Sequence, residues 1–127
     1  MSIAYLDTHA AVLLHDGLIE EFSSEARRQL EASDLLISPM VLFEFGYLFK
    51  RKKIGVEAKA LFTALNTSFG VALCAYPFAS VAHEALDVGW TEDPFDRLIV
   101  AQAQVNHGAK LITRDRLIRQ NYGNAVW

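Results

Sequence analysis

Four acidic residues stand at positions from which their carboxylates can act together. Each lies just after a predicted strand or early in a predicted helix, and they are Asp7, Glu44, Asp96 and Asp115. In a parallel sheet the strand ends and the following helix starts share one edge, where the functional crevice lies. Carboxylates gathered there repel one another unless a divalent cation binds them. Hard oxygen ligands suit Mg²⁺ or Mn²⁺, and no Cys/His spacing indicates zinc.

Three of these acids also suit a purely structural role as helix caps or first-turn residues, namely Asp7, Asp96 and Asp115. Glu44 is different because it is the only charged side chain between residues 34 and 50. A helix that is apolar nearly all round is expected to be largely buried. A buried lone carboxylate is costly unless it is paired or bound to metal. Glu44 therefore favours a metal site, and an arginine partner for it is the structural alternative.

Predicted strands and helices alternate along the chain. Short apolar runs predict strands over residues 3–6, 35–37, 71–75, 110–113 and 125–127. Capping residues and apolar periodicity predict helices over residues 8–14, from Ser23 or Ser24 onward, and over 39–50, 56–67, 78–87, 94–107 and 115–120. This alternation is typical of an α/β fold with a parallel sheet of about five strands flanked by helices. The length predicts one domain over residues 1–127.

The composition is that of a folded globular protein, with 52% apolar and 21% charged residues in a chain of 127. No apolar run reaches the ~18 residues of a membrane span, and no signal-peptide pattern opens the chain. With one cysteine, Cys74, we expect a reduced, cytoplasmic protein. The net charge is −3, and setting aside the four acids would change it to +1. Overall charge therefore neither supports nor excludes a nucleic-acid partner.

Four motifs carry the acids, in this order along the chain: Tyr5–Ala10, Ser38–Glu44, Asp93–Ala103 and Leu111–Asp115. The third begins Asp-Pro-Phe-Asp-Arg and is the most specific. Together they resemble the motifs of the PIN-domain nucleases, and within that family those of the VapC-type toxins of bacterial toxin–antitoxin pairs. The resemblance covers essentially the whole chain, and residues 125–127 suit the family's final strand. It implies a single Rossmann-like PIN domain.

The resemblance also implies an activity, that of a Mg²⁺- or Mn²⁺-dependent endoribonuclease whose metal ligands are Asp7, Glu44, Asp96 and Asp115. The Thr8 and Thr113 hydroxyls would orient carboxylates or water, and Asp93 would be a helix cap or at most an outer group. Candidate contacts to RNA phosphates are Arg97, Arg114, Arg51, Lys52 and Lys53. The implied partners are RNA, a cognate antitoxin and a second copy of the chain in a homodimer, with no membrane.

Two further groups of residues receive a plainer interpretation. The four histidines fall on predicted helices without a mutual pattern, and we interpret them as structural or surface residues, with His9 the one nearest an acid. The apolar helix after the second strand could supply part of a partner interface. Five of its apolar residues are the candidates for this interface: Phe43, Phe45, Tyr47, Leu48 and Phe49. We nevertheless expect at least half of these five to belong to the core.

Two other functions stay open. A PIN-like module could bind RNA or protein without cutting, although a complete set of acids argues against it. An α/β phosphatase could use an aspartate nucleophile after its first strand, but such enzymes carry Asp-x-Asp there, and His9 occupies the second position. A dinucleotide-binding fold is excluded because no Gly-x-Gly-x-x-Gly follows the first strand.

Overall fold

A single parallel sheet organises the chain, and the computed structural model describes residues 2–127 of it. Its strands are β1 (Ser2–Leu6), β2 (Ser33–Ile37), β3 (Ala72–Leu73), β4 (Lys110–Ile112) and β5 (Ala125–Val126). Their spatial order is β3-β2-β1-β4-β5, and every neighbouring pair is parallel. The predicted α/β fold with about five parallel strands is confirmed.

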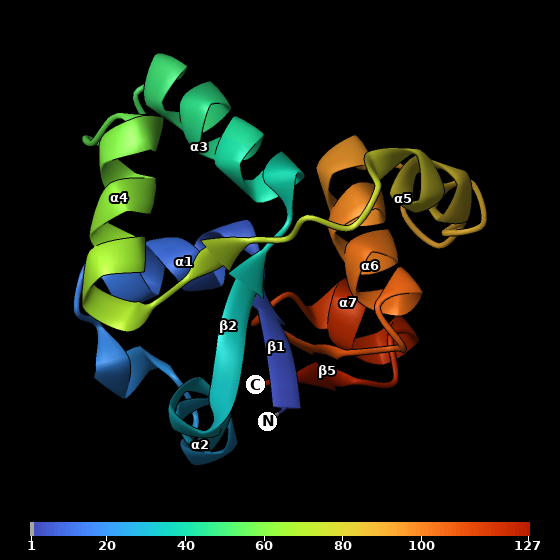
Figure 1. Cartoon of the computed structure of the whole chain (residues 1–127), viewed down its shortest axis with the longest axis horizontal. Helices are drawn as coiled ribbons and strands as arrows, with labels where there is room; N and C mark the ends of the chain where they lie inside the picture. The colour runs from blue at the N-terminus through green and yellow to red at the C-terminus, as the bar shows by residue number, and fades with distance from the viewer. Residues whose placement is uncertain (1) are drawn as a thin grey trace.

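Helices flank the sheet on both sides (Figure 1). They are α1 (Thr8–His15), α2 (Ser24–Ala32), α3 (Pro39–Lys50), α4 (Ala58–Phe69), α5 (Phe78–Ala85), α6 (Pro94–Val105) and α7 (Arg116–Asn121), with a short 3₁₀ helix, η1 (Ile19–Glu21). In Figure 1, α1 and α4 lie on the opposite side of the strands from α6. This arrangement follows from right-handed crossovers that proceed outward in both directions from β1.

The direction of the chain across the sheet reverses between β1 and β4. From β1 the chain moves outward to β2 and β3, and it later returns to β4 and β5 on the other side. The carboxyl ends of β1 and β4 are tied together, because the Asp7 N–H donates to the Ile112 carbonyl at 3.2 Å. In open α/β sheets ligands bind at such a switch point, beyond the carboxyl ends of the strands.

The core fills the space between the sheet and the inward faces of the helices. Its largest fully buried side chains are Tyr5, Phe22, Phe45, Leu6, Leu14, Ile37, Leu61, Leu65, Ile99, Leu111, Ile112 and Ile118. The central strands read as continuous apolar runs because helices cover both of their faces. Within the described residues, no helix is long and apolar enough to cross a membrane.

Several predicted boundaries are wrong by one or a few residues. β3 is an edge strand that pairs with β2 over two residues only, so it is shorter than the predicted 71–75. α4 begins at Ala58 and not at residue 56, because the Glu57 backbone is still extended and caps the helix. η1 was not predicted, since a three-residue 3₁₀ turn leaves no periodic pattern in the sequence.

The burial predicted for α3 is also wrong. Only Val41 and Phe45 of this helix are buried, while Phe43 is 66% and Tyr47 is 45% exposed. The physical reason is the position of α3, which begins at the end of β2 and extends beyond the sheet (Figure 1). The helix contacts α1, α4 and α6, and Phe43 and Tyr47 meet only the Phe95 ring at the edge of α6 among the aromatic contacts of the described residues. Of the five residues for which at least half were expected in the core (Phe43, Phe45, Tyr47, Leu48 and Phe49), only Phe45 is buried.

Candidate metal centre

One pocket at the switch point gathers the four predicted acids. Its volume is about 300 Å³, and it is lined by Asp7, Thr8, His9, Glu44, Asp96, Ile99, Arg114 and Asp115. The end of β1, the N-terminal turns of α1 and α6, the middle of α3 and the loop after β4 each contribute to it. Residues far apart in the sequence therefore meet at the edge of the sheet where a ligand is expected.

Asp7 is the most buried of the four acids, with 7% of its surface exposed. One carboxylate oxygen accepts the Ala10 N–H at 2.8 Å and so caps α1. The other oxygen accepts the hydroxyl of Thr113, which is fully buried. Burial nevertheless raises the pKa of Asp7 to about 6 from its ordinary 3.8, against the effect of both hydrogen bonds. Asp7 is thus a cap and a pocket residue at once.

Glu44 reaches the pocket from the exposed helix α3. Its Oε1 accepts the Thr8 hydroxyl at 2.5 Å, which joins α3 to the first turn of α1. Partial burial, followed by the negative charges of Asp93 and Asp7, raises the pKa of Glu44. In the described part of the chain no basic side chain pairs with Glu44. The structural alternative of an arginine partner is therefore unsupported.

Asp96 carries the strongest sign of crowded negative charge. Burial and then the charges of Asp93, Asp115, Asp7 and Glu44 raise its pKa to about 7. The N-terminus of α6 should favour the ionised form by itself. Burial and repulsion therefore outweigh the helix dipole. Asp93 is the cap of this helix, accepting the Asp96 N–H at 3.1 Å, and it does not line the pocket.

Thr113 connects two of the acids. Besides donating to Asp7, its hydroxyl oxygen accepts the backbone N–H of Asp115 at 3.0 Å. The Asp115 carboxylate in turn accepts the Ile118 N–H at 2.9 Å and caps α7. Because both ends of this chain of hydrogen bonds are fixed to backbone, the threonine holds Asp7 and the start of α7 in one arrangement.

One pocket residue, His9, was interpreted from the sequence as structural or surface. Its Nε2 lies 2.9 Å from an Arg114 nitrogen and accepts from that guanidinium. Burial and the Arg114 charge lower the pKa of His9, which keeps the ring neutral and able to accept. Its position two residues after Asp7, at the same strand end, is the signal that pointed to it.

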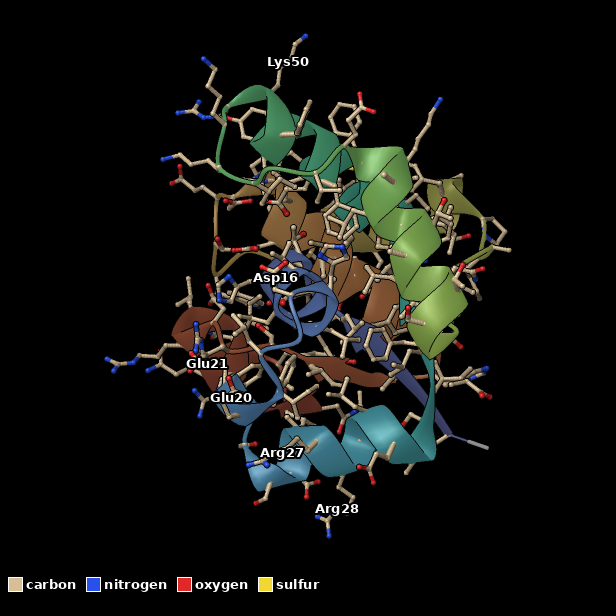
Figure 2. The ribbon with its side chains drawn as sticks, turned by 90° about the vertical axis from the view of Figure 1, so that its left-hand side faces the viewer. Asp16, Glu20, Glu21, Arg27, Arg28 and Lys50 are labelled. Atoms are coloured by element: carbon tan, nitrogen blue, oxygen red, sulfur yellow. The ribbon has the colours of Figure 1, made fainter. Side chains whose placement is uncertain are left out.

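The other basic residues proposed for RNA lie outside this pocket. Arg97 donates to two carbonyl oxygens at the end of α5, at 3.0 and 3.3 Å. Arg51, Lys52 and Lys53 follow α3, and the two lysines line a different pocket that shares no residue with the acidic one. Figure 2 shows Lys50, which precedes this run, at the opposite end of the molecule from Arg28 and well away from Glu21.

The donors in the pocket fit a hard divalent cation. Four carboxylates share the lining with a single arginine, and burial together with the charges of neighbouring acids raises the pKa of Asp96 and Glu44. A divalent ion would relieve this repulsion and is a natural match for oxygen ligands. Within residues 2–127, no three acidic, histidine or cysteine side chains are already arranged to hold an ion.

Replacing Thr113 with valine is expected to weaken Mn²⁺ binding about 10–100-fold, the usual effect of losing a group that orients a metal ligand. The change keeps the side-chain shape but removes the hydroxyl that holds Asp7. Thr113→Ser is the matched control and should stay near the parent value, because it retains the hydroxyl. Calorimetric titration with Mn²⁺ measures both, and equal affinity in the valine variant would show that Thr113 does not position the site.

The fold and pocket define an α/β protein with an acidic centre at the switch point of a five-stranded parallel sheet. The PIN domain family model matches residues 4–124, so the chain belongs to the PIN domain family.

Several solved structures are similar in fold. A toxin–antitoxin complex from Klebsiella pneumoniae has 23% identity and a TM-score of 0.67, over 98% of this chain and 96% of that chain. VapBC2 from Rickettsia felis, bound to a promoter DNA fragment, has 17% identity and a TM-score of 0.61, with 98% and 96% covered. DNA-bound VapBC from Salmonella typhimurium has 14% identity and a TM-score of 0.57, with 99% and 96% covered. No curated protein matches the chain.

Proposed function

We propose that this protein is a divalent-metal-dependent endoribonuclease and the toxin of a toxin–antitoxin pair. The observation that carries the nuclease proposal is the convergence of four carboxylates, from distant parts of the chain, in one pocket at the switch point. Membership of the PIN domain family supports it. The pocket lining contains no serine or cysteine, and the hydroxyl of its one threonine, Thr8, donates to Glu44, so hydrolysis by an activated water suits the pocket better than a covalent intermediate.

In this mechanism Asp7, Glu44, Asp96 and Asp115 would hold one or two Mg²⁺ or Mn²⁺ ions. A bound divalent ion would supply a water of lowered pKa and positive charge for the phosphate oxygens. The Thr113 and Thr8 hydroxyls keep the Asp7 and Glu44 carboxylates in place. Arg114 is the one cationic side chain that lines the pocket, so it is the group that would bind a substrate phosphate.

The substrate we propose is single-stranded or looped RNA, because unstacked strands are the usual targets of sequence-selective proteins. The partner we propose is an antitoxin, since proteins of similar fold are found in toxin–antitoxin complexes. The exposed rings of Phe43 and Tyr47, which lie against the partly buried Phe95, support a protein partner or a second copy beside the pocket. Action in the cytoplasm is part of this proposal.

The function can be tested by incubating the purified protein with labelled single-stranded RNA in Mg²⁺, in Mn²⁺ and in EDTA. We expect internal cleavage in either metal and none in EDTA, because the carboxylates alone supply no electrophile. A small phosphomonoester is assayed in parallel. RNA binding without cleavage would favour the binding module, and turnover of the monoester but not RNA would favour the phosphatase.

A further inference from the structure

A second pocket adjoins the acidic one on the side of α7. It has a volume of about 580 Å³ and is lined by Arg116, Arg119, Gln120, Ala125 and Trp127; we name it the arginine pocket. Two links join it to the acidic pocket. Asp115 of the acidic pocket directly precedes Arg116, and the Arg114 guanidinium lies 5.6 Å from the centre of the Trp127 ring. The two pockets are therefore neighbours, and Arg114 contacts a residue that lines each of them.

The two arginines of this pocket are available to a ligand. Both are exposed, and across the described residues neither guanidinium makes a salt bridge or a hydrogen bond to another residue. Guanidinium groups present planar, paired donors that match phosphate oxygens. In a chain with a net charge of −3, free arginines beside an acidic pocket make a locally positive surface.

Arg114 is held between the two pockets from three directions. Its guanidinium donates to Glu21 Oε1 at 3.1 Å and to His9, and it contacts the Trp127 ring. That ring packs on the buried Phe22, with 4.8 Å between the ring centres. Figure 2 shows Glu21 on the segment that leads from α1 towards α2. Contacts from separate parts of the chain thus fix Arg114 where a strand would pass from one pocket to the other.

We propose that the arginine pocket binds the phosphates of the RNA strand next to the cleavage point, with Arg114 as the link to the acidic pocket. The proposal rests on the nuclease function proposed above. It favours the α7 side over the basic run after α3, because the arginine pocket is linked to the acidic pocket by the Asp115–Arg116 adjacency and by the contact of Arg114 with Trp127. A strand running over α7 meets three arginines in succession: Arg114, Arg116 and Arg119.

The test uses fluorescence anisotropy of a labelled single-stranded RNA in the cleavage-inactive Asp96→Asn background. We expect Arg116→Gln/Arg119→Gln to weaken binding about tenfold at low salt. The plot of log affinity against log salt should become shallower by about 1.4, or about 0.7 for each lost phosphate contact. In the cleavage-active protein the same pair should raise KM and leave kcat nearly unchanged. Lysine at both positions should restore most of the salt dependence.

Arg28→Gln/Lys59→Gln is the matched control, since it removes the same charge from α2 and α4 and should preserve both affinity and salt slope. An unchanged slope in Arg116→Gln/Arg119→Gln, with cleavage intact, would overturn the proposed path alone. Loss of slope in Lys52→Gln/Lys53→Gln instead would place the strand along α3. Failure of the parent protein to bind or cut RNA would overturn the nuclease function and this inference together.

Discussion

Asp96→Asn is expected to reduce RNA cleavage by at least about a hundredfold, since losing a group that merely orients a ligand already costs about 10–100-fold. The same change should make the metal-free protein more stable at pH 8. The Asp96 pKa of about 7 means that the ionised carboxylate is disfavoured in the folded pocket by burial and by neighbouring acids. Asparagine removes that charge. We expect a gain of about 1 kcal/mol, a small value because solvent screens a half-buried group.

Asp87→Asn is the matched control because Asp87 is exposed and lies outside the pocket. It should change neither the cleavage rate nor the free energy of unfolding. Cleavage of RNA in Mg²⁺ and urea denaturation in EDTA measure the two quantities. An Asp96→Asn protein that cuts RNA at the parental rate would remove Asp96 from the mechanism, and one that is less stable would show that the carboxylate has a favourable partner.

Metal-free protein is expected to lose stability as the pH rises from 5 to 8. The carboxyls of Asp7 and Asp96 have an ordinary pKa of 3.8, and burial raises it to about 6 and about 7 in the folded state. The folded state therefore binds more protons than the unfolded state between these values. The protonated Asp7 and Asp96 therefore contribute their full stabilisation to the folded state below about pH 4. This contribution to the free energy of unfolding is lost as the pH rises through 6 and 7.

Divalent metal should reverse this trend. Mn²⁺ binds the ionised carboxylates of the folded state, so its stabilisation should be largest at pH 8 and small at pH 5. At about one hundred times its Kd, a ligand adds about 2.7 kcal/mol. Thermal melting at pH 5, 6.5 and 8, in EDTA and in Mn²⁺, measures the effect. The Asp7→Asn/Asp96→Asn variant should show a flatter pH profile, and equal stabilisation by Mn²⁺ at pH 5 and 8 would contradict this account.

The helix starts were predictable because they depend on local chemistry. Ser23, Ser38, Asp93 and Asp115 each accept a backbone N–H at the start of the helix that follows, as their residue types indicate. The sheet was predictable for a related reason, since strands covered on both faces read as short continuous apolar runs. Convergence of the acids then followed from the geometry of parallel sheets.

The directions of individual side chains, and the contacts between residues far apart in the sequence, were not predictable. Arg97 follows Asp96 in sequence, yet successive helical residues point about 100° apart, and its guanidinium reaches α5 instead of the pocket. The apolar sequence of α3 indicates a surface that avoids water. It does not indicate whether that surface is covered by other parts of the same chain. In this structure Phe43 and Tyr47 stay exposed. His9 lines the pocket and accepts a hydrogen bond from Arg114. The sequence does not indicate this pairing, because the two residues lie far apart along the chain.

The central claim is that the acidic pocket holds divalent metal, and Mn²⁺ titration of the protein at pH 8 tests it most directly. Asp7→Asn is the informative variant, because asparagine is also a good helix cap and should keep α1 in place. Electron paramagnetic resonance of free Mn²⁺ gives the bound fraction. We predict saturable binding of one or two ions by the parent protein and a large loss of affinity in Asp7→Asn. No binding by the parent protein, or equal binding by both, would contradict the account.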